Sequence, residues 1–352
     1  VVTTHRNLQA MTTSLVEAWE WSAEDRILHF LPLHHVHGVV NKLMCGLWSG
    51  ATVEFAGGAG GAPLELWRRL GDADADPLTL FMAVPTIYSK MLEAFPELDD
   101  DEKSSALSGV GQLRLMVSGS AACPAPLFER WEKLTGQRLL ERYGMTEIGM
   151  ALSNPYRGQR NPGFVGMPLP GVSVRVVDPD TEAEVGGDSG DQGELRVKGP
   201  CVFKEYWKRP EATAKEFDEK GWFKTGDVVR FEPSLAAYQI CGRASSDIIK
   251  SGGYKISALE IEREILAHGN VAEVAVVGKP DETWGERVLA VIRWKDAKDP
   301  DAALKPLQGF LKDKLASYKI PRELVTVEDI PKNAMGKVNK KTLLQSLQPL
   351  SE

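Results

Sequence analysis

At 352 residues the chain is too long for one ordinary compact domain and suits two or three. Its 43% hydrophobic and 26% charged residues are ordinary globular values, so neither disorder nor a fibrous repeat is indicated. A net charge of -7 argues against broad electrostatic capture of nucleic acid or of an anionic membrane.

Three further classes are disfavoured. No apolar run approaches the roughly 18 residues of a membrane span. The four cysteines are far apart and form no CxxC pair, so neither a zinc site nor a disulfide framework is indicated, and a reducing intracellular compartment is expected. Residues 1–7 show no secretory or transit peptide and no initiator Met, so we expect the natural N-terminus to lie further upstream.

The first part of the chain predicts an α/β rhythm. Apolar residues near the helical period indicate an amphipathic helix over residues 8–19. An apolar segment, a His-rich turn, a helical stretch and a short strand follow, at residues 28–33, 34–38, 42–48 and 52–55. The apolar runs 78–84 and 113–117 indicate buried parallel strands that end in ligand-facing loops.

Three segments of this part receive no function. The glycine-rich run 57–61 lacks the Lys and Ser/Thr of a Walker phosphate loop and predicts a flexible surface loop. The acidic patches 72–76 and 99–102 are interpreted as solvated loops.

The pattern changes near residue 165, where residues 172–177 and 194–197 alternate as half-exposed antiparallel strands do. From about residue 245 a small α+β unit is predicted, with Ser257 and Glu260 as a capping box for its first helix. Its other elements are strands at 248–249, 271–277, 288–294 and 324–327 and a helix at 304–315. We expect a large domain over 1–244, β-rich from about 165, and a lid domain over 245–352.

Seven motifs stand in a fixed order along the chain. They are LPLHHVHG at 31–38, ERYGMTE at 141–147, GELRVKG at 193–199, TGD at 225–227, GR at 242–243, SGGYKI at 251–256 and PKNAMGK at 331–337. Together they resemble the acyl-adenylate-forming (AMP-binding) superfamily, and within it the acid–CoA ligases, over the whole chain. The resemblance implies an α/β adenylate-forming fold, in which a large domain of mixed sheets, helices and a small β subdomain precedes a small mobile α+β domain.

The resemblance also implies a two-step ligation. A carboxylate attacks the α-phosphate of ATP to give an acyl-adenylate and pyrophosphate, and the thiol of coenzyme A then displaces AMP. The implied cofactors are ATP, Mg²⁺ and coenzyme A as co-substrate. The implied partners are small molecules alone, with no nucleic acid, no membrane span and no protein partner indicated.

By its position in PKNAMGK, Lys337 matches the cation that stabilises phosphate charge in the first step. The alternative is an exposed lysine in a basic tail. Glu147 and Thr146 match the residues that hold Mg²⁺ and phosphate oxygens, which are hard oxygen donors. Their alternative is a helix start with Thr146 as the N-cap.

The nucleotide is assigned to residues from three motifs. Tyr143 would lie against adenine, Asp227 would accept hydrogen bonds from both ribose hydroxyls, and Arg243 would reach the sugar or the phosphates. The alternative for Asp227 is an Asx turn. The full nucleotide-binding set is Tyr143, Gly144, Ser118, Gly119, Asp227 and Arg243.

The stretch between Arg243 and Lys250 is one residue longer than the usual pattern, so the hinge is ambiguous among Ser245, Ser246 and Asp247. The coenzyme A arm would approach glycines that permit close backbone contact. The set assigned to it is Lys250, Ser251, Gly252 and Gly253. Residues 284–286 either flank the same tunnel or form a surface turn.

The acyl pocket is matched by Arg142, Ser120 and the histidines His34, His35 and His37, of which His35 and His37 are candidate helpers and one is structural. A guanidinium in a closed cleft is costly unless paired, which favours a substrate with a second carboxylate. The alternative is that Arg142 pairs with Glu141 and merely shapes the pocket.

These pocket residues resemble malonyl-CoA synthetases, above all the mitochondrial acyl-CoA synthetase family member 3 group. We therefore expect malonate, with methylmalonate as a near neighbour, and a role in fatty acid metabolism in the mitochondrial matrix, with the cytosol as alternative. A medium-chain or aryl acid–CoA ligase remains open. The superfamily's TSGTTG-x-PKG phosphate loop is expected just before Val1, so an inactive fragment is a further alternative.

Overall fold

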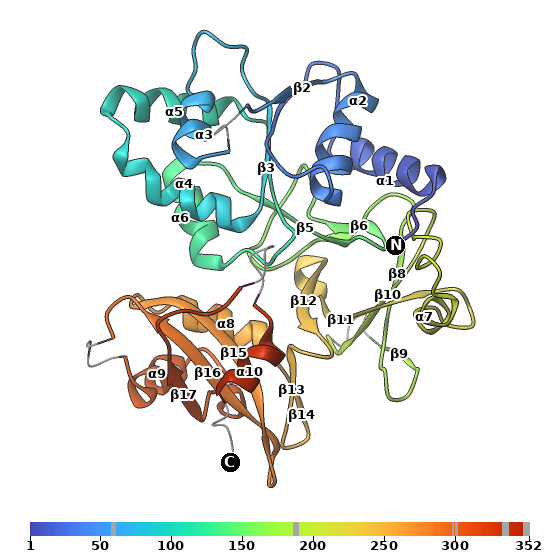
Figure 1. Ribbon diagram of the computed structural model, residues 1–352, viewed down its shortest axis with the longest axis vertical. Helices are drawn as coiled ribbons and strands as arrows, with labels where there is room; N and C mark the ends of the chain where they lie inside the picture. The colour runs from blue at the N-terminus through green and yellow to red at the C-terminus, as the bar shows by residue number, and fades with distance from the viewer. Residues whose placement is uncertain (58–60, 186–189, 298, 300–301, 333–337, 348–352) are drawn as a thin grey trace. The chain divides into compact units, whose positions relative to one another are not determined.

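The computed structural model describes residues 1–352 except 58–60, 186–189, 298, 300–301, 333–337 and 348–352. The chain forms two compact units (Figure 1). Unit 1 comprises Val1–Thr225 and Arg230–Gln239, and unit 2 comprises Gly226–Val229 and Ile240–Glu352. The domain limits expected from the sequence, at residues 165 and 244/245, stay predictions.

The main sheet of unit 1 has the strand order β2-β1-β3-β4-β5-β6-β7. The strands β1 to β5 pair in parallel, and β6 and β7 continue the sheet in antiparallel pairing. Their bounds are β1 Arg26–His29, β2 Thr52–Phe55, β3 Leu80–Ala83, β4 Leu115–Ser118, β5 Leu140–Met145, β6 Gly149–Ser153 and β7 Met167–Pro168. The parallel pairing predicted for the two apolar runs is confirmed by β3 and β4.

Both faces of this sheet are covered because its central strands are apolar on both sides. In β3, Phe81 and Ala83 face one buried cluster, whereas Leu80 and Met82 face the other, as the period of two in a strand requires. On the first face lie α3 Pro63–Leu70, α4 Pro85–Ala94, α5 Asp100–Gln112 and α6 Ala125–Thr135 (Figure 1). On the second lie α1 His5–Ala18, the π-helix η1 His37–Met44 and α2 Cys45–Ser49.

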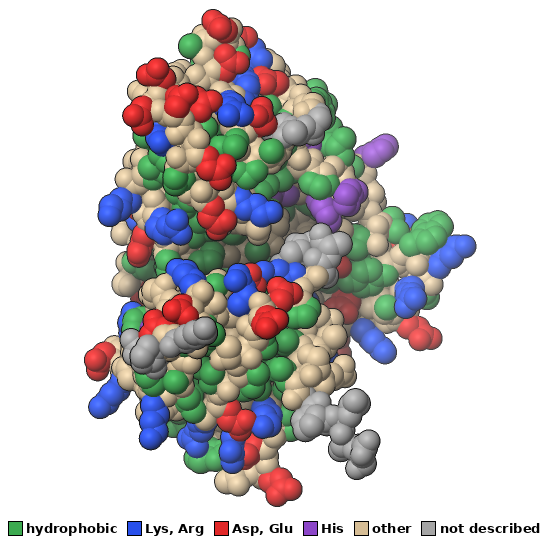
Figure 2. Space-filling view, turned by 60° about the vertical axis from the view of Figure 1, so that its left-hand side comes forward, with side chains coloured by type: hydrophobic (Ala, Val, Ile, Leu, Met, Phe, Trp, Pro, Cys, Tyr) green, Lys and Arg blue, Asp and Glu red, His purple; other side chains and the backbone are tan. Residues whose placement is uncertain are grey.

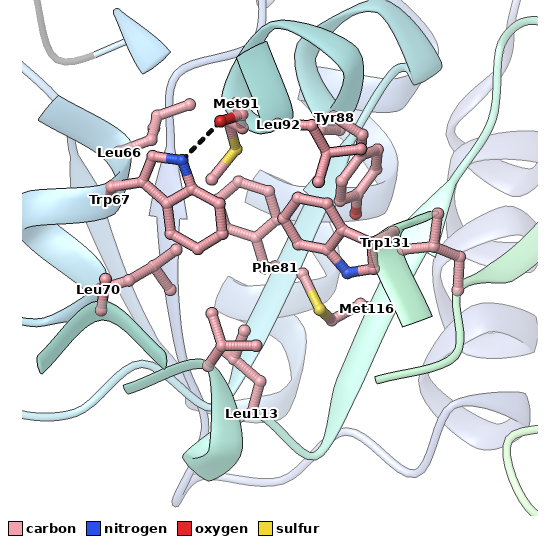
Figure 3. Close-up of a cluster of buried hydrophobic side chains, with 14 of the residues drawn as sticks. Leu66, Trp67, Leu70, Phe81, Tyr88, Met91, Leu92, Leu113, Met116 and Trp131 are labelled. Carbon is pink, nitrogen blue, oxygen red and sulfur yellow. Dashed lines mark hydrogen bonds between the residues drawn. The ribbon is translucent and has the colours of Figure 1, made fainter. Parts of the chain in front are cut away.

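The first face is built around two tryptophans (Figure 3). The rings of Trp67 and Trp131 stack with centroids 5.5 Å apart, and the indole N–H of Trp67 donates to the carbonyl of Met91 at 2.8 Å. Tyr88 packs edge-on against Trp131 at 4.8 Å. Large aromatic areas removed from water make this cluster the main stabiliser of the helical layer.

Two expectations for unit 1 are corrected. The acidic patch at 99–102 is not a loop, because Asp99 caps α5 in a reciprocal capping box with Glu102, where acidic residues also suit the helix dipole. Figure 2 shows acidic side chains gathered on the surface of this helical layer. The predicted helix over 8–19 begins earlier, at His5, because Thr4 and Asn7 form a capping box there.

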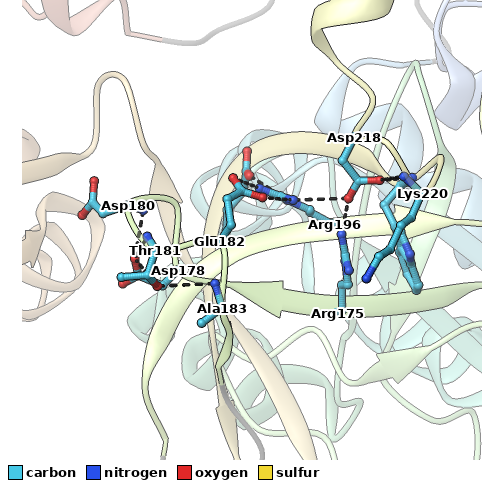
Figure 4. Close-up of polar contacts among 11 residues, drawn as sticks. Arg175, Asp178, Asp180, Thr181, Glu182, Ala183, Arg196, Asp218 and Lys220 are labelled. Atoms are coloured by element: carbon cyan, nitrogen blue, oxygen red, sulfur yellow. Dashed lines mark hydrogen bonds and ion pairs between the residues drawn. The ribbon is translucent and has the colours of Figure 1, made fainter.

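The second sheet has the order β12-β11-β10-β8-β9. Its strands are β8 Ser173–Val177, β9 Glu184–Val185, β10 Gln192–Lys198, β11 Phe223–Glu232 and β12 Ala237–Arg243. Antiparallel pairing of β8 with β10 confirms the prediction from alternation. One of its arginines, Arg196, is buried but fully paired, at 2.7 Å to Glu182 and 3.2 Å to both Glu194 and Asp218 (Figure 4).

Unit 2 contains a sheet of order β14-β13-β16-β15, with β17 paired in parallel to β16. The strands are β13 Ile248–Ser251, β14 Tyr254–Ser257, β15 Val271–Asp281, β16 Gly285–Trp294 and β17 Glu323–Thr326; the helices are α8 Ala258–Leu266, α9 Leu304–Leu311 and α10 Lys340–Leu347. Ser257 caps α8 by accepting from the N–H of Glu260, as predicted, but the Glu260 carboxylate binds Lys319 at 2.7 Å and does not complete the capping box.

No helix within the described ranges is long and apolar enough to span a bilayer. The four cysteines are free and buried. Burial raises the pKa of the Cys201 thiol to about 11 and those of Cys45 and Cys123 further. At neutral pH these thiols are therefore protonated and unreactive.

Candidate active site

The carboxyl ends of β4 and β5 bring Arg142 and Ser120 together. Parallel pairing places Glu141 opposite Ser118, so Arg142 lies beside the loop that leaves β4. The guanidinium is 4% exposed and donates from Nη2 to the Ser120 hydroxyl at 3.1 Å. Gly119 leaves room for the guanidinium, because a Cβ there would lie 2.6 Å from its central carbon and would displace the Arg142 side chain.

Ser120 links Arg142 to His37. Its hydroxyl lies 3.3 Å from Nδ1 of His37, while its backbone has a φ of 69°, in the left-handed region that few non-glycine residues adopt. Such strain is typical of positions held for function. His37 is buried, whereas His34 is exposed and His35 half-buried, so of the three histidines His37 is the one that contacts this pair.

Arg142 has no carboxylate partner among the described residues. Burial alone lowers the pKa of its guanidinium to about 9. The alternative of pairing with Glu141 is not found, because the Glu141 carboxylate instead accepts from the backbone N–H of Gly163 at 2.8 Å and of Cys123 at 3.4 Å. The adjacent residues of a strand point to opposite faces, which separates the two charges.

The sequence reasoning missed Asn41 and Lys42 on the π-helix η1. Both are fully buried, and the side-chain atoms of Asn41 have no hydrogen-bond partner in the described structure. The Lys42 ammonium donates to the Met82 carbonyl at 3.1 Å and lies 3.9 Å from the centre of the Phe30 ring. A lysine inside an apolar helical stretch was the available signal.

His37, Ser120, Arg142 and Lys42 form one polar cluster at the ends of β3, β4 and β5. Burial first, and then the charges of Arg142 and Lys42, hold the pKa of His37 well below its ordinary value, so His37 is neutral at pH 7. Nε2 of His37 and Nε of Arg142 are buried without a partner within the described ranges. The cluster thus combines buried cationic and unsatisfied polar groups, which favours an anionic ligand.

Thr146 and Glu147 lie in the turn that joins β5 to β6. The predicted alternative of a helix start is wrong, because Gly149 adopts a φ of 61° and the chain reverses into an antiparallel hairpin. Thr146 is exposed and Glu147 half-buried. Glu147 Oε1 accepts from the Tyr206 hydroxyl at 3.0 Å, which orients the carboxylate.

Tyr143 and Gly144 precede this turn on β5. Tyr143 is half-buried, with its hydroxyl 4.0 Å from the Met145 sulfur. Gly144 permits the close approach of the two strands, because a Cβ there would lie 2.1 Å from the Gly149 carbonyl oxygen. This segment therefore carries a half-buried aromatic ring a few residues before the oxygen donors of Thr146 and Glu147.

In unit 2, Asp227 and Arg243 form an ion pair, with Nε of Arg243 3.0 Å from Oδ1 of Asp227. The Asp227 side chain is 10% exposed and that of Arg243 43%. The two strands that carry them are tied by the N–H of Ala244, which donates to the Gly226 carbonyl at 2.9 Å. The carboxylate and guanidinium thus lie in contact, and their assignment to the ribose stays a prediction.

Residues 250–253 form the end of the β13–β14 hairpin. Gly252 and Gly253 have φ values of 57° and 83°, as a two-residue hairpin turn requires, and Ser251 pairs with Tyr254 across it. Trp284 lies against this turn, since its carbonyl accepts from the N–H of Gly252 at 2.9 Å. Lys250 is exposed and its backbone N–H donates to Glu286 at 2.6 Å.

Lys337 lies outside the described residues, so its role stays a prediction. Within the described ranges, no three His, Cys, Asp or Glu side chains gather as a metal site. The single carboxylate of Glu147 and the hydroxyl of Thr146 nevertheless fit Mg²⁺, which binds through one or two protein oxygens together with substrate phosphates.

This fold and these motifs define an acyl-adenylate-forming protein, and the chain belongs to the AMP-binding enzyme family. The family model for AMP-binding enzymes matches residues 1–207, and that for the AMP-binding enzyme C-terminal domain matches residues 260–337. Both the resemblance and the adenylate-forming fold expected from the motifs are confirmed.

The chain is 48% identical to the mitochondrial malonate–CoA ligase ACSF3 of Mus musculus, over 99% of this chain and 62% of that protein. The ATP-bound structure of MatB from Rhodopseudomonas palustris superposes with a TM-score of 0.85 at 36% identity, over 99% of this chain and 65% of MatB. A malonyl-CoA ligase solved with methylmalonyl-CoA and AMP has a TM-score of 0.61 at 39% identity, over 94% and 68%. The chain thus spans about three fifths of the curated relative.

Proposed function

We propose that the protein ligates malonate to coenzyme A in two steps, through a malonyl-adenylate, with release of pyrophosphate and then AMP. The observation that carries this proposal is the buried Arg142, which donates to Ser120 and has no carboxylate partner among the described residues. A malonate carboxylate would supply that partner. The relatives named as malonate–CoA and malonyl-CoA ligases support the same acid.

The reacting carboxylate and the distal carboxylate of malonate need different surroundings. The distal group would accept a bidentate pair from Arg142, because a planar guanidinium matches a carboxylate fork. His37, held neutral by burial, can donate or accept a hydrogen bond without adding charge. The second carboxylate is then left to attack the phosphate, since one end of the substrate is fixed.

The remaining roles are proposed for the motif residues. Thr146 and Glu147 would hold Mg²⁺, which would neutralise phosphate charge when bound. Asp227 and Arg243 would bind the ribose, Tyr143 and Gly144 the adenine, and Ser118 and Gly119 the adenylate; Lys337 would stabilise charge in the first step. Coenzyme A would bind along Lys250, Ser251, Gly252 and Gly253.

The test is a substrate panel with the full-length protein. ATP–pyrophosphate exchange and thioester formation are measured with malonate, methylmalonate, acetate, octanoate and benzoate. We expect malonate to be used most efficiently and methylmalonate next. A preference for acetate, octanoate or benzoate would contradict the dicarboxylate assignment.

We further propose a mitochondrial location, in fatty acid metabolism. The mouse relative is named as mitochondrial, which supports a mitochondrial over a cytosolic location. Fractionation of cells that express the full-length protein with a C-terminal tag tests this location, and recovery in the cytosolic fraction alone would contradict it.

A further inference from the structure

Unit 2 contains a buried ion cluster that no motif role accounts for. Lys340 begins α10, and its ammonium lies 2.7 Å from Oδ1 of Asp247 and 2.7 Å from Oε1 of Glu262. The three side chains are 10%, 16% and 14% exposed. By contrast, Lys332 pairs with Glu273 at 2.7 Å near the surface and is 41% exposed.

The cluster depends on the lysine charge. Burial disfavours the charge on Lys340, but Glu262 and Asp247 outweigh burial, so the pKa of Lys340 is raised. Burial also raises the pKa of Glu262, against the lowering effect of Lys340. Removal of Lys340 would therefore leave two poorly solvated carboxylates without their counter-ion.

Asp247 carries the effect of this cluster to Arg243. While Oδ1 of Asp247 binds Lys340, Oδ2 accepts from the backbone N–H of Arg243 at 2.9 Å, and the N–H of Asp247 donates to the Arg243 carbonyl at 2.8 Å. Gly242 makes room for this turn, because a Cβ there would lie 2.4 Å from that of Asp247. One carboxylate thus fixes both a lysine of α10 and the backbone that presents Arg243.

Glu262, the other acid of the cluster, is also bound to the backbone. Glu262 lies on α8, and its Oε1 also accepts from the backbone N–H of Val276 in β15 at 2.7 Å. The Lys340 ammonium therefore bridges Glu262 of α8 and Asp247 in the turn after β12. A shift of Lys340 would be transmitted to the Asp247 side chain, whose other oxygen holds Arg243.

We propose that Lys340 is a positioning residue for nucleotide binding: through Asp247 it holds the turn that directs Arg243 toward Asp227. The proposal rests on the proposed function only in taking Asp227 and Arg243 as the ribose site. Lys340 follows Lys337 by three residues in the sequence, so the same cluster anchors the chain next to the lysine expected to act on the phosphates.

The test is the affinity of the full-length protein for Mg·ATP, measured by titration calorimetry without any acid. We expect Lys340→Met to raise the Kd on the order of tenfold, because small misplacements of positioning groups have effects of this size or more. The matched controls are Lys341→Met, the exposed neighbour, and Lys332→Met, which removes a surface ion pair. Both controls should stay within about twofold of the wild type.

A second variant separates positioning from folding. Lys340→Met combined with Glu262→Gln removes the repulsion between the carboxylates but leaves Asp247 without its lysine, so it should fold and show the same rise in Kd. Partial unfolding would instead lower the number of binding sites with the Kd unchanged. A folded double variant whose Kd is within twofold of the wild type would overturn the proposal.

The same data distinguish the two proposals. A wild-type protein that does not bind Mg·ATP contradicts the ligase assignment and the ribose role of Arg243 together. If the wild type binds Mg·ATP and both Lys340→Met and its combination with Glu262→Gln bind it equally well, only the positioning role is contradicted.

Discussion

Replacement of Arg142 by Met should lower activity with malonate without lowering the stability of the unliganded protein. In the unliganded protein the guanidinium is 4% exposed with no described carboxylate partner, so its desolvation is uncompensated. Methionine fills much of the same volume without a charge, and its cost in lost packing and in the Ser120 contact is on the order of 1 kcal/mol. We therefore expect the unliganded variant to be as stable as the wild type or more stable.

Activity with malonate should fall sharply in the same variant. Truncation of one partner of a buried charge pair costs about 2–5 kcal/mol, which corresponds to roughly 30-fold to several-thousandfold in kcat/KM for malonate. Acetate has no second carboxylate that needs the guanidinium as a counter-ion. Its kcat/KM should stay within a few-fold or improve.

The assay pairs thermal unfolding without ligand with kcat/KM for malonate and acetate in the full-length protein. Arg138→Met is the matched control, because Arg138 is 42% exposed and makes only a surface pair with Glu132 at 3.2 Å among its ion pairs in the described structure. A variant of Arg142 that melts several degrees lower and loses both substrates equally would refute the reasoning and make Arg142 structural.

Three further outcomes are expected. Lys42→Met should leave the melting temperature within a few degrees of the wild type or raise it. Burial holds the pKa of Lys42 well below its usual range, and its charge has no acid partner among the described residues. A fall in the free energy of unfolding of more than about 3 kcal/mol would show that the ammonium is needed. His37→Gln should make the free energy of unfolding less dependent on pH below about 6.5. The folded pKa of His37 is depressed, so in the wild type its contribution to the free energy of unfolding is complete above the unfolded pKa near 6.5. That contribution is lost as pH falls below this value, by up to about 1.4 kcal/mol per pH unit. Equal acid lability of wild type and variant in urea titrations at pH 7 and pH 5 would count against that shift. Lys337→Ala should block adenylation while thioester formation from preformed malonyl-adenylate continues, and equal loss in both half-reactions would argue against its assigned role.

Most helices and strands could be predicted from short sequence patterns, because the apolar period that marks them is a local signal. The strand at 52–55 has the predicted limits, and the runs near 78–84 and 113–117 became β3 and β4. Helix ends were less well predicted where a cap lies outside the apolar repeat, as Thr4 does for α1. The helix start weighed as the alternative for Thr146 was wrong: Ser/Thr followed by an acid is shared by helix starts and hairpin turns, and only pairing with β6 decides between them.

The candidate site also divides into residues that motifs could assign and contacts that only the tertiary structure shows. The motif resemblance assigned Arg142, Ser120, His35 and His37 to the acyl pocket and Asp227 and Arg243 to the nucleotide, because residue types at fixed spacing record shared chemistry. That Glu141 faces away from Arg142, and that Glu260 binds Lys319 rather than its own helix end, depends on what lies on each side of a strand or helix. Such partners come from distant parts of the sequence.

The sequence by itself therefore determined the family, the α/β character and the order of the motifs, and it singled out Arg142 as the candidate cation for a dicarboxylate. Only the tertiary structure decided which charges are paired. Arg196 and Lys340 each meet carboxylates in the interior, whereas Arg142 and Lys42 are buried with none among the described residues. The physical reason is that the cost of a buried charge depends on its distance to every neighbouring group, and those distances are set by the packing of segments far apart in the chain.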